Sequence, residues 1–326
     1  MKYCWVCFIV CGLFVSCFSS LFTDGNHYDD RALTVQTLSL FNQRIPSRFS
    51  DLSWKGDWAF RRERLNLIDR GLRGIKPDLL IIQEAMSKKE SPSDSDRNIL
   101  LAGALRDYDW HLRVVREYGD TQEVEAMAVA TSYPLKVDRA RTLTQKELWD
   151  IGAGGFVTAT AIDFDNYPIL VFNVQMPVSS VNRELWYLFV RDKIKERIKE
   201  EGLCQKRIIV AGYLPDSNKS SKYRELLTAL GLKDASSGFC ELESSCYTST
   251  PINEIFMATI GDERPSRSDR ILVPTSTVVL SSSPNFREIG DSEMVKKFGL
   301  TKLWGTQRYG WVANMRFARC ETDLEQ

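Results

Sequence analysis

The sequence predicts an α/β sandwich, and three observations support that prediction. The chain has 326 residues and is 43% hydrophobic, enough to bury the core of one large domain. Apolar runs typical of strands alternate with segments that repeat at helical spacing. No repeat or long low-complexity stretch divides the chain. We therefore expect a single folded domain, residues 31–326.

The first half of that domain contains a helix between strands. Leu33–Phe41 has a strand pattern, and Phe60–Ile75 places its apolar residues on one helical face. Asp78–Ile82 is a continuous apolar run, typical of a strand buried on both faces. Met127–Thr131 and a strand that begins at Leu135 are expected to pair through the short Ser-Tyr-Pro turn between them.

The second half continues the alternation. Phe156–Phe164 and Ile169–Val174 are expected to pair around Asp-Asn, and a long helix then ends at Gly202. The inward face of that helix is predicted to carry Leu185, Leu188, Phe189, Ile194 and Ile198. The remaining elements are a helix at Ser221–Leu230 and strands at Arg207–Ala211, Arg270–Val273, Ser276–Leu280 and Trp311–Phe317.

The first twenty residues have the features of an export signal. Lys2 supplies a positive start, and the apolar run Cys4–Phe18 ends among small residues. We expect residues 1–20 to be a signal peptide, residues 21–30 a short linker, and the mature chain to lack a transmembrane segment. The predicted location is secreted or cell-envelope. A lipid anchor at Cys17 is a weaker prediction, and a retained anchor or a buried first strand is the alternative.

The cysteines outside that segment suggest two disulfides. Four of the eight cysteines precede residue 20, which leaves an even number in the expected domain. We predict one local bridge and one long closure; four unpaired thiols in a reducing compartment are the alternative. The predicted pairs are Cys240–Cys246 and Cys204–Cys320.

Charge and histidine content narrow the function. Lys plus Arg and Asp plus Glu each number 43, so no basic excess favours nucleic acid as a partner. The sequence contains only two histidines, His27 and His111, so a mechanism that needs two imidazoles must use both. His27 precedes the first expected strand, and His111 lies in a strand expected at the side of the sandwich.

Eight segments in order resemble the endonuclease/exonuclease/phosphatase superfamily, the deoxyribonuclease I-like fold, and most closely its neutral sphingomyelinase branch. The resemblance covers roughly residues 31–318. It implies a four-layer α/β/β/α sandwich of two mixed sheets with flanking helices. The segments are Leu33–Phe41, Arg61–Leu65, Pro77–Glu84, Tyr133–Pro134, Val171–Gln175, Ile209–Gly212, Arg267–Val273 and Thr306–Gly310.

The resemblance also implies a site and a chemistry. Members of the superfamily hydrolyse phosphodiesters with a divalent metal, held by a Glu and an Asn, that neutralises charge as water attacks. An Asp–His pair activates that water, a second His steadies the phosphorane, and an Asp and an Asn orient the nucleophile and substrate. By that pattern, the retained positions here are Glu84, a residual metal ligand, and Asp269.

The other positions of the pattern are replaced. Ser39 stands for the metal-binding Asn, Gln175 for the second His, and Tyr213 and Pro215 for the orienting Asp and Asn. Gln307 and Arg308 replace the water-activating pair. An amide does not titrate near neutral pH and a guanidinium is always charged, so neither can act as a base. Each missing acid–base group is typically worth about 10² to 10⁴ in rate.

We therefore expect an exported, catalytically inactive pseudoenzyme without a cofactor, which binds a protein, a lipid head group or a small ligand through the former catalytic face. One alternative is an active Mg²⁺-dependent, sphingomyelinase-like phosphodiesterase whose ligands have moved to Asp216, Asp262 or Glu263. Another is a secreted structural or host-interaction protein that uses the sandwich as a scaffold.

Structural roles compete with functional ones at several positions. Glu84 could end a strand without binding metal, or pair with Arg308 in the vacated metal volume. Asp269 is expected to pair with Arg267 or Arg270. Asn173 and Gln175 are expected to be hydrogen-bonded inside the sandwich. Four aromatic residues could line a pocket, form a protein-binding surface or belong to the core: Tyr213, Trp304, Tyr309 and Trp311.

Overall fold

The structure is a computed structural model, and it describes most of the expected domain. The described residues are 28–40, 61–88, 103–117, 123–136, 142–143, 148, 150, 152–177, 180–202, 204, 207–215, 220–240, 246–248, 267–285, 289–290, 303–304 and 310–320. The expected signal peptide lies outside them.

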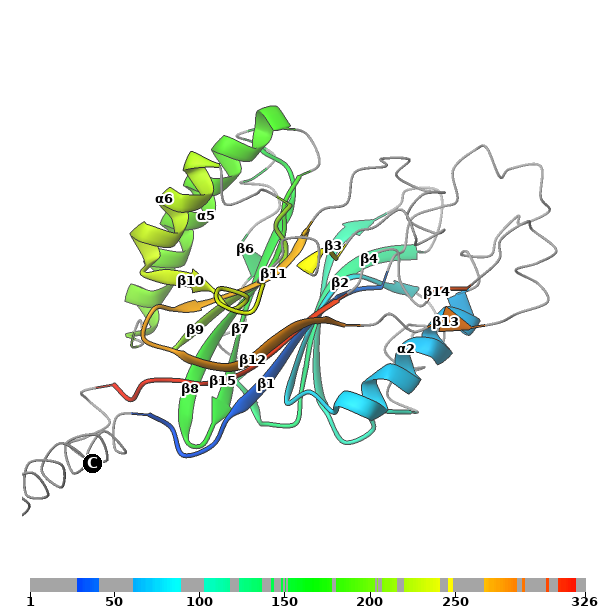
Figure 1. Ribbon diagram of the computed structural model, residues 1–326. Helices are drawn as coiled ribbons and strands as arrows, with labels where there is room; N and C mark the ends of the chain where they lie inside the picture. Colours follow the sequence, from blue (N-terminus) through cyan, green and yellow to red (C-terminus); the bar gives the residue numbers. More distant parts are fainter. Residues whose placement is uncertain are drawn as a thin grey trace, which may run out of the picture.

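One of the two large sheets has six strands among the described residues, in the order β12-β15-β1-β2-β4-β3 (Figure 1). β1 and β2 are parallel, and the other neighbours are antiparallel. The strands are β1 (Leu33–Ser39), β2 (Leu79–Lys88), β3 (Asp109–Glu117), β4 (Glu123–Thr131), β12 (Val278–Asn285) and β15 (Gly310–Arg316).

The other large sheet has seven described strands, in the order β10-β11-β9-β8-β7-β5, with β6 also paired to β7. Here β8 and β9 are the parallel pair. The strands are β5 (Leu135–Lys136), β6 (Thr142–Leu143), β7 (Phe156–Phe164), β8 (Tyr167–Gln175), β9 (Ile208–Tyr213), β10 (Leu232–Asp234) and β11 (Asp269–Pro274). A small ribbon pairs β13 (Ile289–Gly290) with β14 (Leu303–Trp304).

The two sheets face each other, and helices cover their outer faces (Figure 1). Apolar side chains from both sheets, such as Val35 and Val171, form one core between them. A second core packs α5 (Ser180–Glu201) and α6 (Ser221–Leu230) on the seven-stranded sheet, and a third packs α2 (Arg61–Ile75) on the six-stranded sheet. The predicted α/β/β/α sandwich is confirmed.

Several local predictions are also confirmed. β7 and β8 form a hairpin whose turn residues, Asp165 and Asn166, have φ values of 50° and 69°. Asp and Asn tolerate this left-handed conformation better than most residues. The long helix ends before Gly202, whose φ is 59°, and α6 spans Ser221–Leu230 as predicted.

The predicted pairing of the strand Met127–Thr131 with the strand that begins at Leu135 is wrong. Residues 127–131 belong to β4, which pairs with β2 and β3, whereas β5 pairs with β7 in the other sheet. The turn between them therefore passes from one sheet to the other. A turn motif specifies a change of direction, but the next strand's partner is decided by packing.

The predicted inward face of the long helix is partly wrong. Leu185 is 47% exposed, and the fully buried side chains of α5 include Trp186 and Val190. Ile194 is buried as predicted, while Leu188 is only partly buried. The two adjacent aromatic residues after Leu185 have more apolar surface to bury, which rotates the contact face of the helix by about one position.

Both predicted disulfides are present, Cys204–Cys320 and Cys240–Cys246. The first lies where the two ends of the described chain meet: Tyr28 forms a β-bridge with Ala318, and the Asp29 amide donates to the Phe317 carbonyl at 2.9 Å. The fold thus includes the last residues of the segment that we expected to be a linker.

Asp29 also forms a buried ion pair with Arg207, next to the same disulfide. Burial raises the pKa of the Asp29 carboxyl despite the neighbouring guanidinium. Among the described helices, none is both long and apolar enough to cross a membrane.

Candidate functional site

Five of the eight predicted site residues lie at one end of the two sheets. Ser39 is the last residue of β1, and Glu84 lies in the adjacent parallel strand β2. In the other sheet, Gln175 and Tyr213 are opposite each other at the ends of β8 and β9, and Tyr213 is opposite Asp269 at the start of β11. The parallel pairs bring these strand ends to the same edge of each sheet.

Glu84 is the centre of this arrangement, and the backbone turns it toward the other sheet. The ladder between β2 and β4 shifts register between Ile82 and Ala85, and Glu84 has φ of 55°. A bulge of this kind re-aims a side chain, and a positive φ at a residue other than glycine has an energetic cost. Such strain is typical of functional positions.

The Glu84 carboxylate, 4% exposed, accepts hydrogen bonds from two neutral side chains. The Ser39 hydroxyl donates to Oε2 at 2.8 Å, and the Gln175 amide donates to Oε1 at 3.2 Å across the two sheets. The Gln175 Oε1 atom is buried and has no hydrogen-bond partner among the described residues. Gln175 is partly buried and one of its two polar ends is bonded, so the expected hydrogen bonding inside the sandwich is met in part.

A second neutral network begins at Gln83, the residue before Glu84, and joins the two sheets. The Asn173 amide donates to the Ile82 and Ala128 carbonyls at 2.7 and 3.1 Å, and it accepts from Gln83 at 2.8 Å. Gln83 in turn accepts from Thr37 at 3.3 Å. The two bonds to backbone carbonyls tie β8 to β2 at Ile82 and to β4 at Ala128, so Asn173 is hydrogen-bonded inside the sandwich as predicted.

The Gly-Tyr-Leu-Pro segment requires its glycine. Gly212 has φ of 139°, and a Cβ built on it would lie 2.0 Å from the Val174 carbonyl oxygen. Tyr213, which follows, packs with its partly buried ring against the core under α5 and α6. The backbone amide of Leu214 donates to the Ser268 carbonyl at 2.7 Å, which fixes the chain before Pro215.

Asp269 is fully buried, and its backbone is held by a residue that the sequence did not single out. The Thr248 hydroxyl oxygen accepts from the Ser268 and Asp269 amides at 2.8 and 3.1 Å. Arg267 and Arg270, the partners expected for Asp269, both form ion pairs with Asp234, at 2.7 and 2.6 Å. The expected pairing with Asp269 stays a prediction.

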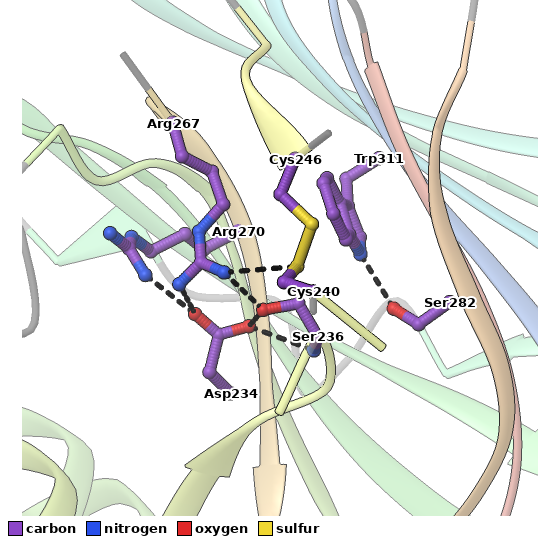
Figure 2. The surroundings of a disulfide bond; sticks show 8 residues. All are labelled: Asp234, Ser236, Cys240, Cys246, Arg267, Arg270, Ser282 and Trp311. Atoms are coloured by element: carbon purple, nitrogen blue, oxygen red, sulfur yellow. Dashed lines mark hydrogen bonds and ion pairs between the residues drawn. A yellow bond between two sulfur atoms is a disulfide. The ribbon is translucent and has the colours of Figure 1, made fainter. Parts of the chain in front are cut away.

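Asp234 is therefore the main carboxylate of a buried charged cluster (Figure 2). Burial opposes its ionisation, but the two guanidinium groups and the Ser236 hydroxyl and amide lower the pKa of Asp234 below its ordinary value. Tyr223 of α6 donates to the same carboxylate at 3.3 Å. The cluster binds β10, β11 and α6 together.

Of the remaining predicted site residues, Pro215 follows β9 and is partly buried, whereas Gln307 and Arg308 lie outside the described residues. The proposed Glu84–Arg308 ion pair, His27 and the alternative ligands Asp216, Asp262 and Glu263 are therefore predictions that the structure does not address.

Of the four aromatic residues expected to line a pocket, form a binding surface or belong to the core, the structure describes the side chains of Tyr213 and Trp311. Trp311 is 1% exposed, packs in the core between the sheets, and donates to Ser282 at 2.7 Å, so it belongs to the core (Figure 2). Tyr309 and the Trp304 side chain are not described. His111 lies in β3, the edge strand of its sheet, as predicted.

Two of the residues that hold the site in place have no functional signal in the sequence. Gln83, Asn173 and Thr248 interact with residues 20 to 91 positions away in the chain. Asn173 and Gln83 lie in segments of the resemblance, but the pattern gives Gln83 no role, and Thr248 lies in none of the segments. Only the meeting of distant strands reveals them.

The donors around Glu84 are a poor fit to the divalent metal that the resemblance implies. Mg²⁺ prefers carboxylate, carbonyl and water oxygens. Here the carboxylate oxygens accept bonds from a hydroxyl and an amide NH₂, and the described residues contain no group of three Asp, Glu, His or Cys side chains suited to hold a metal ion. We therefore derive no catalytic step through a metal.

Comparisons with known proteins identify the fold. No family model and no curated protein matches the sequence. An endonuclease/exonuclease/phosphatase family protein from Leptotrichia buccalis superposes with a TM-score of 0.59 at 13% identity, over 87% of this chain and 99% of that one.

Two further solved structures agree. A mannosyl-6-phosphatase from Bacteroides thetaiotaomicron has a TM-score of 0.56 at 14% identity, covering 87% and 99% of the two chains. Truncated TDP2 from Caenorhabditis elegans has a TM-score of 0.55 at 13% identity, covering 88% and 98%. The chain thus has the fold of endonuclease/exonuclease/phosphatase proteins, and at these identities the likeness concerns the fold alone.

Proposed function

We propose that this protein is an exported, catalytically inactive relative of the phosphodiesterases that share its fold, closest to their sphingomyelinase-like branch. In this proposal, its former catalytic face binds a ligand or a partner. The observation that carries it is the environment of Glu84. The carboxylate expected to hold the metal is engaged by Ser39 and Gln175, two neutral groups that stand where the superfamily has a metal ligand and an imidazole.

The electrostatics of these replacements supports the proposal. In an active enzyme, a cation at this carboxylate would neutralise the charge that develops on the transferred phosphoryl group. The serine hydroxyl and the glutamine amide that bond this carboxylate carry no positive charge. Glu84 and Gly212, the residues of the family pattern that this chain retains here, both have positive φ, and this backbone shapes the face without supplying that chemistry.

The proposed export rests on separate evidence. The first twenty residues have the pattern of a signal peptide, and two disulfides are typical of proteins in oxidising compartments. The sphingomyelinase-like assignment rests on the eight sequence segments. Neither depends on the argument about catalysis.

The test combines metal binding with turnover. Purified mature protein is titrated calorimetrically with Mg²⁺, Mn²⁺ and Ca²⁺, and its hydrolysis of bis(p-nitrophenyl) phosphate and of sphingomyelin vesicles is measured with and without Mg²⁺. Glu84→Gln is the matched variant, because it keeps size and hydrogen bonding and removes the charge. We expect no stoichiometric binding at micromolar concentration and no metal-dependent turnover in either protein.

Metal-dependent hydrolysis that disappears in Glu84→Gln would overturn the proposal and favour the active phosphodiesterase. Hydrolysis that survives Glu84→Gln would also contradict it, and would place the chemistry elsewhere. A second variant, Gly212→Ala, distorts the face without touching a charge. It is used to confirm that any binding of sphingomyelin vesicles depends on this face.

A further inference from the structure

The two disulfides have different surroundings, and the difference indicates different sensitivity to reduction. Cys204–Cys320 joins residues 116 positions apart and lies beside the buried Asp29–Arg207 ion pair. Cys240–Cys246 joins residues 6 positions apart. A bridge that closes a long loop restricts the unfolded chain more than one that closes a short loop, so folding protects the long bridge more strongly.

A guanidinium group lies against the shorter bridge. Arg267 Nη1 is 3.5 Å from Cys240 Sγ (Figure 2). Arg267 is held there by Asp234, by Ser236 Oγ at 2.5 Å, and over the Trp311 ring at 6.0 Å. Its position is therefore set by the fold before any change at the sulfur.

The charge of Arg267 favours a thiolate at Cys240. The Arg267 guanidinium places a positive charge 3.5 Å from Cys240 Sγ. Neighbouring positive charge stabilises a thiolate, and stabilising the reduced form makes a disulfide easier to reduce. Cys240 is partly exposed, whereas Cys246 is 3% exposed, so Cys240 is the sulfur that a reductant can reach.

The bridge is connected to the candidate site by a short path. Cys246 is two residues from Thr248, whose hydroxyl oxygen accepts from the Ser268 and Asp269 amides. The Ser268 carbonyl accepts from Leu214, and Asp269 lies opposite Tyr213. The bridge thus helps to hold the threonine that fixes the start of β11.

We propose that Cys240–Cys246 is a redox-sensitive disulfide, and that its reduction by a dithiol releases Thr248 and loosens the start of β11 at the candidate site. A dithiol thiolate attacks Cys240 Sγ, the S–S bond breaks, and Cys246 leaves as a thiolate that takes up a proton. The second thiol of the reductant, once deprotonated, attacks its own sulfur in the mixed disulfide. Cys240 leaves as a thiolate beside Arg267, and the reductant becomes a disulfide.

The first experiment compares the two bridges in one molecule. The full mature chain is equilibrated in dithiothreitol buffers of graded ratio of reduced to oxidised form, the free thiols are trapped with iodoacetamide, and each cysteine is read by mass spectrometry. We expect Cys240–Cys246 to open at a ratio at least about tenfold lower than Cys204–Cys320. Simultaneous opening, or earlier opening of Cys204–Cys320, would refute the proposal.

A charge variant tests the role of Arg267. Arg267→Gln is expected to require an about tenfold higher ratio to open Cys240–Cys246, while Arg267→Lys stays near wild type. Because Arg267→Gln also removes an ion pair with Asp234, its fold is checked by circular dichroism. If it fails to fold, Arg267→Lys is compared with wild type at raised pH, where only a neutralised lysine should lose the effect. If loss of the Arg267 charge leaves unchanged the dithiothreitol ratio at which Cys240–Cys246 opens, the charge is not the cause of its sensitivity to reduction.

The link to the site is read without any ligand, so it does not depend on the proposed function. Hydrogen exchange of the Ser268 and Asp269 amides should accelerate at least about tenfold in reduced protein and in the double variant Cys240→Ser with Cys246→Ser, which keeps the ion pairs. The Asp29 amide, beside the other disulfide, is the control and should not change. Unchanged exchange at Ser268 and Asp269 would overturn the link.

Discussion

Two buried polar networks hold this protein together, and they use opposite chemistry. The network next to the candidate site is neutral. Its amide and hydroxyl groups, which join the two sheets, belong to Asn173, Gln83 and Thr37. The cluster of Asp234 with Arg267 and Arg270 is ionic, and it joins neighbouring strands of a single sheet.

The difference follows from the cost of burying charge. An ion in the interior needs partners that stay at fixed distance, which adjacent strands and a short loop provide. At the candidate site, where the two sheets meet, the neutral amides of Asn173 and Gln83 make the connection at a lower desolvation cost. The charged Glu84 at the same interface accepts hydrogen bonds from the neutral Ser39 and Gln175 side chains. The ionic cluster of Asp234, Arg267 and Arg270 therefore lies beside the candidate site and stabilises the fold.

The largest expected effect comes from breaking the ionic cluster. Asp234→Asn keeps the size of the side chain but leaves two buried guanidinium groups without their shared carboxylate, and should lower the free energy of unfolding by about 3–5 kcal/mol. Urea denaturation measures it. The matched control is Glu225→Gln, since Glu225 also binds two cations, Arg191 and Lys222, but on the surface.

Removing the exposed Glu225 charge should cost less than about 1 kcal/mol. Equal effects of the two substitutions would mean that burial does not distinguish the clusters, and the comparison would fail.

A smaller effect is expected from the neutral network. Asn173→Leu leaves the Ile82 and Ala128 carbonyls without their donor, and should cost about 1–3 kcal/mol. Gln36→Leu is the control, because both polar atoms of Gln36 are buried without a hydrogen-bond partner among the described residues. That change should be neutral or stabilising. Thermal unfolding measures the stability of both variants. If Gln36→Leu loses as much stability as Asn173→Leu, the hydrogen bonds of Asn173 are not what stabilises the network.

The smallest expected effect is a pH dependence from His111. Burial, and secondarily Arg113, lowers the pKa of His111 below its ordinary value. Below the unfolded-state value of about 6.5, the unfolded chain therefore binds more protons than the native one, so stability falls as pH drops below that point. Denaturation at pH 8 and pH 5.5 should show a loss in wild type that shrinks in His111→Gln.

The ionic cluster should stay intact over that range, because the lowered pKa of Asp234 keeps its carboxylate charged until the solution is more acidic than its ordinary value of 3.8. If His111→Gln loses as much stability as wild type between pH 8 and pH 5.5, a group other than His111 causes the pH dependence.

The sequence predicted the fold because its evidence is periodic and local. Apolar spacing identified α6 and the strands on each side of the Asp-Asn turn, and four cysteines outside the expected signal peptide were enough to propose both bridges. The same reasoning failed where partners are distant. β4 and β5 follow each other along the chain but enter different sheets, and Leu185 was assigned inward although Trp186 is the buried residue.

The sequence by itself therefore determined the element types, the order of motifs and the identities of the residues that we propose to replace a metal ligand and an imidazole, since these depend on residue type and spacing alone. Tertiary structure decided how those residues are used. It placed Gln175 across the sheets from Glu84, gave both arginines to Asp234, and set Arg267 against Cys240. Contacts between residues tens of positions apart are selected by packing, and local patterns carry no information about them.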